Sequence, residues 1–191
     1  GIGSFYSPRK FFGLPDGGIA LLKDDASLEL ERDQLSYTRC EHLLKRYDLG
    51  ANAAYRDFIK SADSLMNENI MYMSTLTSAL MKNIDYKYVK ETRRENYAYL
   101  HSHLSDINLL SMELSDGDVP LAYPLLIETE GMREYLISHK IYIPKYWPNI
   151  NEYASNESNA VYMAKNLISI PIDQKCSIID MQRIVHILGK Y

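Results

Sequence analysis

The sequence has few cysteines, and the two that it has, Cys40 and Cys176, stand far apart. A zinc site or a redox pair needs thiols at close spacing, so two separate reduced thiols are indicated. Paired histidines are also lacking, because His101 and His103 are two residues apart and would lie on different faces of a helix. The remaining histidines have no partner nearby in the sequence: His42, His139 and His186. The sequence therefore predicts no metal site.

Basic runs and long hydrophobic runs are missing as well. A net charge of −4 and a pI near 5.7, without any run of Lys and Arg, argue against a general nucleic-acid surface. The longest apolar stretches, such as 121–127, are too short to span a bilayer, and no charged-then-apolar leader opens the chain. No Gly-x-Ser-x-Gly elbow, Walker-type phosphate loop or dinucleotide fingerprint occurs. We therefore expect a cytoplasmic protein with neither nucleic-acid nor membrane partners.

The first twenty residues contain the pattern that suggests a site. Lys10 lies between two turn-forming clusters, Ser-Pro at 7–8 and Pro-Asp-Gly-Gly at 15–18, and the apolar run Ile19–Leu22 follows. This order is typical of a lysine presented at the end of a short strand. Pro-Asp-Gly-Gly is also an ordinary turn signal, and a lysine beside Arg9 is commonly a solvated surface charge. Both interpretations remain open from spacing alone.

Helices are expected from residue 24 to residue 104. The charged stretch Leu28–Tyr47 is either a surface helix or a partly ordered excursion before Gly50. Apolar residues at three-and-four spacing predict an amphipathic helix over 51–66, and a shorter helix is expected within 70–81. Asp85 is a suitable N-cap for a long helix over 86–104, whose charged outer face is expected to be solvated.

The second half alternates strands and helices, and with 46% apolar residues over 191 positions the chain can bury one good core or two small ones. Strands over 107–114 and 119–127 are expected to form a hairpin through the turn 115–118, with the second strand at an edge because of its prolines. The capping-box residues Ser177 and Asp180 predict the start of a final helix. The other expected elements are helices over 132–139 and 160–167 and short strands over 141–144 and 169–172. Together they predict an α+β arrangement with helices on one face of a mostly antiparallel sheet.

Aromatic residues gather around the single tryptophan, Trp147, and among them are Tyr142, Tyr146 and Tyr153. Aromatic faces pack on pyranose rings, so these side chains could line a sugar site. Residues of this kind more often anchor cores and interfaces, and we favour that role.

The run 4–10, Ser-Phe-Tyr-Ser-Pro-Arg-Lys, with the acidic-Gly-Gly element at 16–18, resembles a segment of the DegT/StrS-type aminotransferases. These enzymes bind pyridoxal 5'-phosphate (PLP), mostly act on nucleotide sugars, and share the aspartate aminotransferase-like fold of type I. The resemblance implies that Lys10 is the Schiff-base lysine and that Ser4 or Ser7 binds the cofactor phosphate. Arg9 and the Phe-Phe pair at 11–12 depart from the family pattern. Downstream likenesses lie at 93–97, 119–124, 144–148 and 170–174.

This resemblance implies a mixed α/β fold in two parts. Residues 1–84 would be the C-terminal part of the large cofactor-binding domain, and 85–191 the small α+β domain, entered by a long interdomain helix. We expect a C-terminal fragment that is inactive in isolation, because the carboxylate facing the pyridine nitrogen and the rest of the cofactor cradle precede the lysine segment in the family. The whole enzyme would be a homodimer that makes amino sugars for surface polysaccharide. The alternative is a catalytically silent folding or oligomerisation domain of the same fold.

Overall fold

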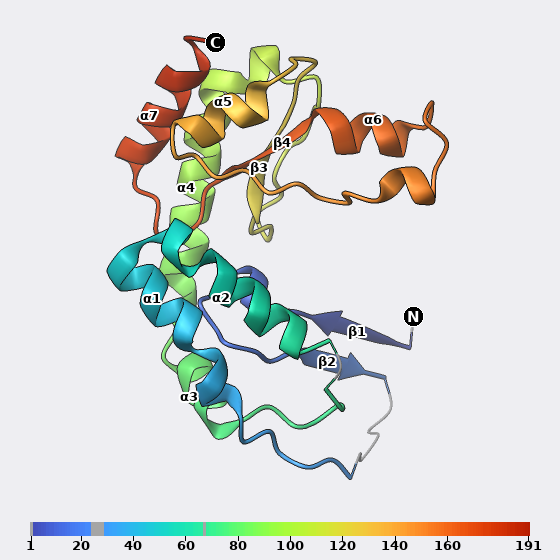
Figure 1. Cartoon of the computed structure of the whole chain (residues 1–191). Helices are drawn as coiled ribbons and strands as arrows, with labels where there is room; N and C mark the ends of the chain where they lie inside the picture. The colour runs from blue at the N-terminus through green and yellow to red at the C-terminus, as the bar shows by residue number, and fades with distance from the viewer. Residues whose placement is uncertain (1, 24–28, 67) are drawn as a thin grey trace. The chain divides into compact units, whose positions relative to one another are not determined.

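A computed structural model of the chain describes residues 2–23, 29–66 and 68–191 (Figure 1). Its contacts divide into two compact units, Gly1–Ile84 and Asp85–Tyr191, here called unit 1 and unit 2. The described part combines helices with two small antiparallel sheets, so the predicted mixed α/β class is confirmed. No helix among the described residues has the length and apolar character needed to cross a membrane.

Unit 1 begins with a β-hairpin. Strand β1 (Gly3–Tyr6) pairs antiparallel with β2 (Ile19–Leu22), so that Gly3 lies opposite Leu22 and Tyr6 lies opposite Ile19. The apolar run at 19–22 is thus a strand, as predicted. All eight residues of the hairpin are exposed, although most are apolar and none is charged. Both faces of this strand pair therefore lack a covering layer among the described residues.

Three α-helices complete unit 1: α1 (Glu41–Leu49), α2 (Ala51–Ser64) and α3 (Thr75–Lys82). Gly50, at φ 85°, separates the first two, a left-handed conformation that favours glycine. The predicted amphipathic helix is confirmed as α2. Its apolar face is not a core face, however, because Tyr55, Phe58 and Ile59 are exposed by 40–62%.

The helices found within 28–47 and 70–81 are shorter than the segments in which they were expected. Within 28–47, of which Leu28 lies outside the described residues, a 3-10 helix (Ser36–Arg39) precedes α1. The helix expected within 70–81 begins only at Thr75, because Ser74 caps it by accepting a hydrogen bond from the Thr77 amide.

Unit 2 is built on two helices with capped N-termini. Helix α4 (Tyr86–Leu104) matches its predicted range, and Asp85 caps it by accepting from the Tyr88 amide at 2.9 Å. Helix α7 (Ile178–Leu188) begins with the predicted capping box of Ser177 and Asp180. Both helices contribute to one apolar core, whose fully buried members include Leu100, Tyr123, Leu125, Leu136, Ile170, Ile172 and Met181.

The sheet of unit 2 differs from the prediction. Strand β3 (Ala122–Leu126) pairs antiparallel with β4 (Leu167–Pro171), from much later in the chain. The expected hairpin with 107–114 is wrong: that segment runs from a 3-10 helix (Ser105–Ile107) into irregular chain outside any strand. Its Leu109 amide donates to the Leu126 carbonyl. The turn at 115–118 is present, closed by the Asp118 amide donating to the Ser115 carbonyl.

The remaining elements of unit 2 are α5 (Met132–Ser138), a 3-10 helix (Ile150–Glu152) and α6 (Asn159–Asn166). The strand expected over 141–144 is absent from the structure, although Ile141 and Ile143 are buried, because this segment packs on the core without a ladder partner. Helix α6 is present as predicted, but none of its residues is fully buried, so the expected buried face is wrong.

Candidate functional site

Lys10 lies in the connection between β1 and β2. The connection starts with a 3-10 helix (Pro8–Lys10), in which the Lys10 amide donates to the Ser7 carbonyl at 3.1 Å. Proline fits the first turn because its fixed φ suits the helix and its missing N–H is not needed there. Pro8 is buried and Lys10 is exposed. The sequence thus fixes the backbone of the turn and leaves the lysine side chain open to solvent.

The two serines considered as phosphate contacts precede this turn. Ser4 lies on β1, opposite Leu21, and Ser7 occupies the N-cap position of the 3-10 helix. Ser7 does not use its hydroxyl as a cap, and both serines are exposed. Within the described part of the chain, neither hydroxyl nor the Lys10 amine makes a hydrogen bond or an ion pair. All three groups are therefore available to a ligand.

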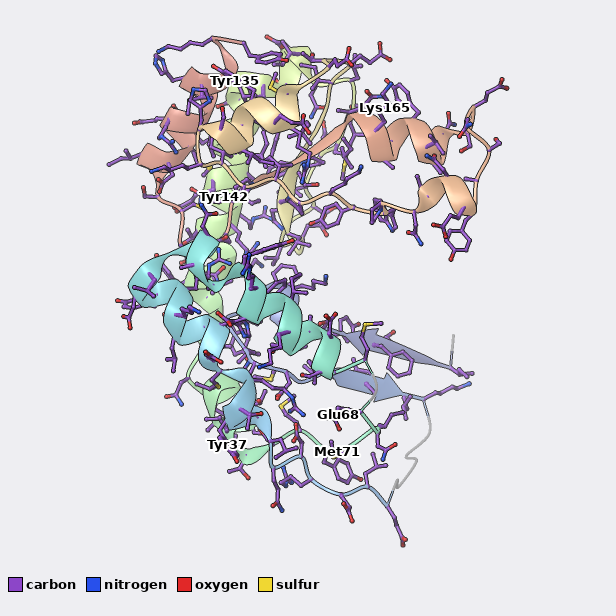
Figure 2. All side chains as sticks on the ribbon, in the orientation of Figure 1. Tyr37, Glu68, Met71, Tyr135, Tyr142 and Lys165 are labelled. Atoms are coloured by element: carbon purple, nitrogen blue, oxygen red, sulfur yellow. The ribbon has the colours of Figure 1, made fainter. Side chains whose placement is uncertain are left out.

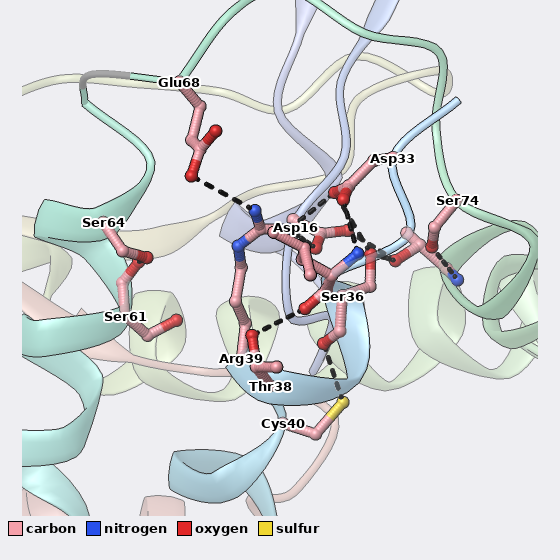
Figure 3. A network of polar contacts seen from close by, with 12 residues as sticks. Asp16, Asp33, Ser36, Thr38, Arg39, Cys40, Ser61, Ser64, Glu68 and Ser74 are labelled. Carbon is pink, nitrogen blue, oxygen red and sulfur yellow. Dashed lines mark hydrogen bonds and ion pairs between the residues drawn. The ribbon is translucent and has the colours of Figure 1, made fainter. Parts of the chain in front are cut away.

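The second half of the connection is anchored in unit 1 through Asp16, which is 4% exposed. Its carboxylate accepts a hydrogen bond from Arg39 Nη1 at 2.9 Å and one from Thr77 Oγ1 at 2.5 Å (Figure 3 shows Asp16 and Arg39). Arg39 ends the 3-10 helix before α1, and Thr77 lies in α3. One buried carboxylate thus joins the lysine connection to two other elements. Buried charges need such partners, since an unpaired one is costly.

Arg39 also serves a second carboxylate, that of Asp33. Arg39 Nη1 donates to Asp33 Oδ2 at 2.5 Å, and Nη2 lies 3.8 Å from a Glu68 oxygen (Figure 3). Burial by itself would lower the pKa of the Arg39 guanidinium, but the hydrogen bonds to Asp16 and Asp33 raise it. Burial would likewise raise the pKa of Asp33, but the Leu35 amide and Arg39 lower it. We call Asp16, Asp33, Arg39 and Thr77 the anchor network.

Gly17, directly after Asp16, makes the close approach to α3 possible. Its φ of 97° is one that side chains rarely adopt, and a Cβ there would lie 3.0 Å from Thr77 Cγ2 and 3.1 Å from Met73 Cε. The Asp-Gly-Gly element is therefore structural in unit 1: the aspartate is bonded to the network and the first glycine fits against α3.

Arg9, beside Lys10, is less exposed than the lysine. It is half-buried, and burial lowers the pKa of its guanidinium, with Asp16 raising it and Arg39 lowering it. Burial, and after it the charge of Arg9, lowers the pKa of His42 on α1. Two neighbouring cations are thus separated, with Arg9 held against the unit and Lys10 left in solvent.

Sequence reasoning proposed Lys10, Ser4 and Ser7, whose roles stay predictions, and it missed the anchor network. Arg39 lies in the charged stretch 28–47, for which either a surface helix or a partly ordered excursion was expected, and nothing in its spacing indicates a buried partner 23 residues earlier. Arg93 was missed in the same way. It is 2% exposed, and its guanidinium donates to the carbonyls of Pro120 and Leu121 at 3.2 and 2.9 Å. For the anchor network, the one possible signal in the sequence was Asp16, the acidic residue before the two glycines.

A mixed α/β chain begins with a two-stranded apolar hairpin around a lysine and continues into a second unit, where helices pack with an antiparallel strand pair. No protein-family model matches the sequence. No curated protein matches it either.

Solved structures do match the fold. A sugar aminotransferase from Micromonospora echinospora superposes with a TM-score of 0.58 at 15% identity, over 98% of this chain and 52% of that one. A DegT/DnrJ/EryC1/StrS aminotransferase from Brucella abortus gives 0.58 at 16% identity, over 100% and 51%. Spr1654 from Streptococcus pneumoniae, a PMP-form structure, gives 0.58 at 15%, over 99% and 52%.

The resemblance to the DegT/StrS-type sugar aminotransferases is thus confirmed as a likeness of fold. The chain spans about half the length of the structures that it matches.

Proposed function

We propose that this chain is part of a PLP-dependent aminotransferase of nucleotide-linked sugars, with Lys10 as the residue that holds the cofactor. The observation that carries the proposal is the likeness of fold to sugar aminotransferases, combined with an exposed lysine in a turn that the anchor network holds in place. PLP needs an amine for its aldehyde and hydrogen-bond donors for its phosphate. Lys10, Ser4 and Ser7 supply these groups from one hairpin, so the residues present fit the cofactor.

Each residue then has a defined task. Lys10 would hold the cofactor through Nζ, and the same amine would carry a proton during the reaction. Ser4 or Ser7 would donate a hydrogen bond to the cofactor phosphate. Asp16 and Arg39 act as positioning residues, since they fix the backbone that follows the lysine. The cofactor, when bound, supplies the electron sink that a transamination requires.

The finer assignments are part of the same proposal. Unit 1 is the C-terminal part of a cofactor-binding domain and unit 2 is the small domain; the whole enzyme is a cytoplasmic homodimer that serves surface-polysaccharide synthesis. We expect the chain by itself to be inactive, because it spans half the length of the matched structures and its lysine is open to water.

The test is chemical trapping on the longest polypeptide that contains this sequence. The protein is incubated with PLP, reduced with borohydride and digested, and the adduct is located by mass spectrometry. The expected result is one phosphopyridoxyl group at Lys10, lost in Lys10→Ala and kept in Lys23→Ala, a matched change just beyond β2. A label at another lysine, or no label, would rule out the proposed role of Lys10.

A second candidate is a catalytically silent domain that serves folding or assembly. The exposed β1–β2 hairpin favours it, because an uncharged strand pair without covering layers is a suitable contact surface. Light scattering and binding of a hydrophobic dye test this role on the purified chain. A monomer that binds no dye would argue against such a contact surface.

A further inference from the structure

The chain contains the dipeptide Asp-Gly twice, once in each unit, as Asp16-Gly17 and Asp116-Gly117. An aspartate before glycine can rearrange its peptide bond, because glycine has no side chain to shield its amide nitrogen from the neighbouring carboxyl group. The side chains of both units are drawn in Figure 2, and the contacts of Asp16 are seen from close by in Figure 3. Since the two dipeptides are identical, their surroundings decide which of them reacts.

The dipeptide of unit 1 is held in place by its contacts. The Asp16 carboxylate is buried and accepts hydrogen bonds from Arg39 at 2.9 Å and from Thr77 at 2.5 Å. Gly17 packs so closely on α3 that a Cβ there would lie 3.0 Å from Thr77 Cγ2. To reach the glycine amide, the carboxyl group would have to give up both hydrogen bonds, which are of the strong, charge-assisted kind. The buried dipeptide is thus protected from the rearrangement.

The dipeptide of unit 2 has none of these contacts. Asp116 and Gly117 are both exposed, in the middle of the turn 115–118. Among the described residues, the Asp116 carboxylate makes no hydrogen bond or ion pair, and the Gly117 amide donates no hydrogen bond. A Cβ at Gly117 would have no atom within 4 Å beyond the adjacent residues. The carboxyl group and the amide nitrogen are therefore free to approach each other.

The two ends of this turn, in contrast, are bonded to each other and to α4. The Asp118 amide donates to the Ser115 carbonyl at 3.1 Å, and the Ser115 amide donates to Asp118 Oδ2 at 2.8 Å. From α4, Arg94 Nη1 donates to the carbonyls of both residues, Ser115 at 2.8 Å and Asp118 at 2.7 Å. One guanidinium nitrogen reaches both carbonyls only while the turn has its ordinary backbone length.

We propose that Asp116 is a modification site, at which isoaspartate forms spontaneously. The Gly117 amide nitrogen bonds to Cγ of Asp116, and one water molecule leaves with the proton of the nitrogen and the hydroxyl of the carboxyl group. Water then opens the resulting succinimide at the α-carbonyl carbon of Asp116 and breaks its bond to nitrogen. The main chain now passes through Cβ and Cγ, and the α-carboxylate is free. The reaction needs only water, and Lys10 takes no part in it.

The modification changes the turn itself. Isoaspartate at position 116 adds one carbon to the main chain between Ser115 and Asp118, and this carbon moves the two carbonyls that Arg94 joins. The hydrogen bond from the Asp118 amide to the Ser115 carbonyl is then lost as well. The isomer should therefore loosen the attachment of α4 to the chain that leads into β3, while the anchor network of unit 1 stays unchanged.

The test ages the folded protein at neutral pH and physiological temperature in water enriched in heavy oxygen, followed by digestion and mass spectrometry. Each passage through the succinimide adds one heavy oxygen to the aspartate, and electron-transfer fragmentation distinguishes isoaspartate from aspartate. We expect isoaspartate to form at Asp116 at least about tenfold faster than at Asp16, which must first lose its hydrogen bonds. In the isomerised fraction, hydrogen exchange at the Asp118 amide should be about twofold to tenfold faster.

Two controls separate the effect of the structure from that of the dipeptide. In urea, where the contacts of Asp16 are gone, the two aspartates should react at similar rates. Gly117→Ala shields the amide nitrogen and should slow the reaction at Asp116 about tenfold or more, and the open space around position 117 lets this variant fold. No isoaspartate at 116, equal rates at the two aspartates in the folded protein, or an unchanged rate in Gly117→Ala overturns the proposal.

Discussion

Arg39 is the residue whose replacement should cost unit 1 the most. Arg39→Met keeps an unbranched side-chain stem and removes the cation that joins Asp16 to Asp33. Two hydrogen bonds to ionised acceptors are lost, each worth about 1.5–3 kcal/mol. The two carboxylates then have no cation beside them at a position where the Arg39 side chain is only 5% exposed. Removing one partner from a buried ion pair typically costs about 3–5 kcal/mol, so we expect a loss in that range from the free energy of unfolding.

The assay must resolve the two units. Urea unfolding followed by pulsed hydrogen exchange and mass spectrometry gives separate transitions for peptides from α1 and α3 and for peptides from α4 and α7. Arg39→Met should shift the first pair to lower urea and leave the second in place. Arg39→Lys should give an intermediate shift, because it keeps the positive charge but lacks the rigid guanidinium whose Nη1 donates to both carboxylates.

The control is Arg46→Met on α1, an exposed arginine of the same element, which should leave both transitions unchanged. A loss below about 1 kcal/mol for Arg39→Met, the value typical of a solvent-screened pair, would refute the reasoning.

Three other predictions concern single residues. Burial, and after it the charge of Arg9, lowers the pKa of His42, so the imidazole stays neutral in the folded chain and the unfolded chain takes up a proton first. The urea midpoint of unit 1 should therefore fall as the pH drops below the ordinary pKa of 6.5, and His42→Phe should flatten this pH dependence. Gly17→Ala should destabilise unit 1 in urea by about 1–3 kcal/mol because of its φ of 97°, whereas Gly117→Ala, with open space around it, should not. Burial raises the pKa of the Cys176 thiol to about 11, so iodoacetamide should alkylate it roughly a hundredfold more slowly than an ordinary cysteine at pH 8, and the rate should rise about tenfold per pH unit. Rapid alkylation at pH 8, detected by mass spectrometry, would contradict this.

Elements that depend on local sequence were predicted well. Helices α4 and α7 could be located because their caps, Asp85 and Ser177, are adjacent to the residues that they satisfy. The partner of β3 could not be found in this way. The nearest apolar segment, 107–114, was the natural candidate for a hairpin, but the ladder is made with β4, and no local pattern specifies a pairing over such a distance.

The candidate site likewise combines features set by adjacent residues with features set by distant contacts. The turn that presents Lys10 follows from adjacent residues, and the roles of Lys10, Ser4 and Ser7 stay predictions. The partners of Asp16, which are Arg39 and Thr77, come from two separate segments and depend on tertiary contacts that a single sequence does not reveal. Apolar periodicity likewise indicated helix α2 correctly without indicating that its apolar face is exposed.

The β3–β4 ladder has a consequence for the order in which unit 2 folds. Its paired residues are about 40–50 positions apart, so the chain must close a long loop before the first ladder bond forms. The two capped helices need no such closure and can form within microseconds. Because non-local pairings slow folding, we expect the rate-limiting step of unit 2 to be the arrival of Leu167–Pro171 at the edge of β3. Truncations or insertions within 127–166 should then change the folding rate more than they change the unfolding rate.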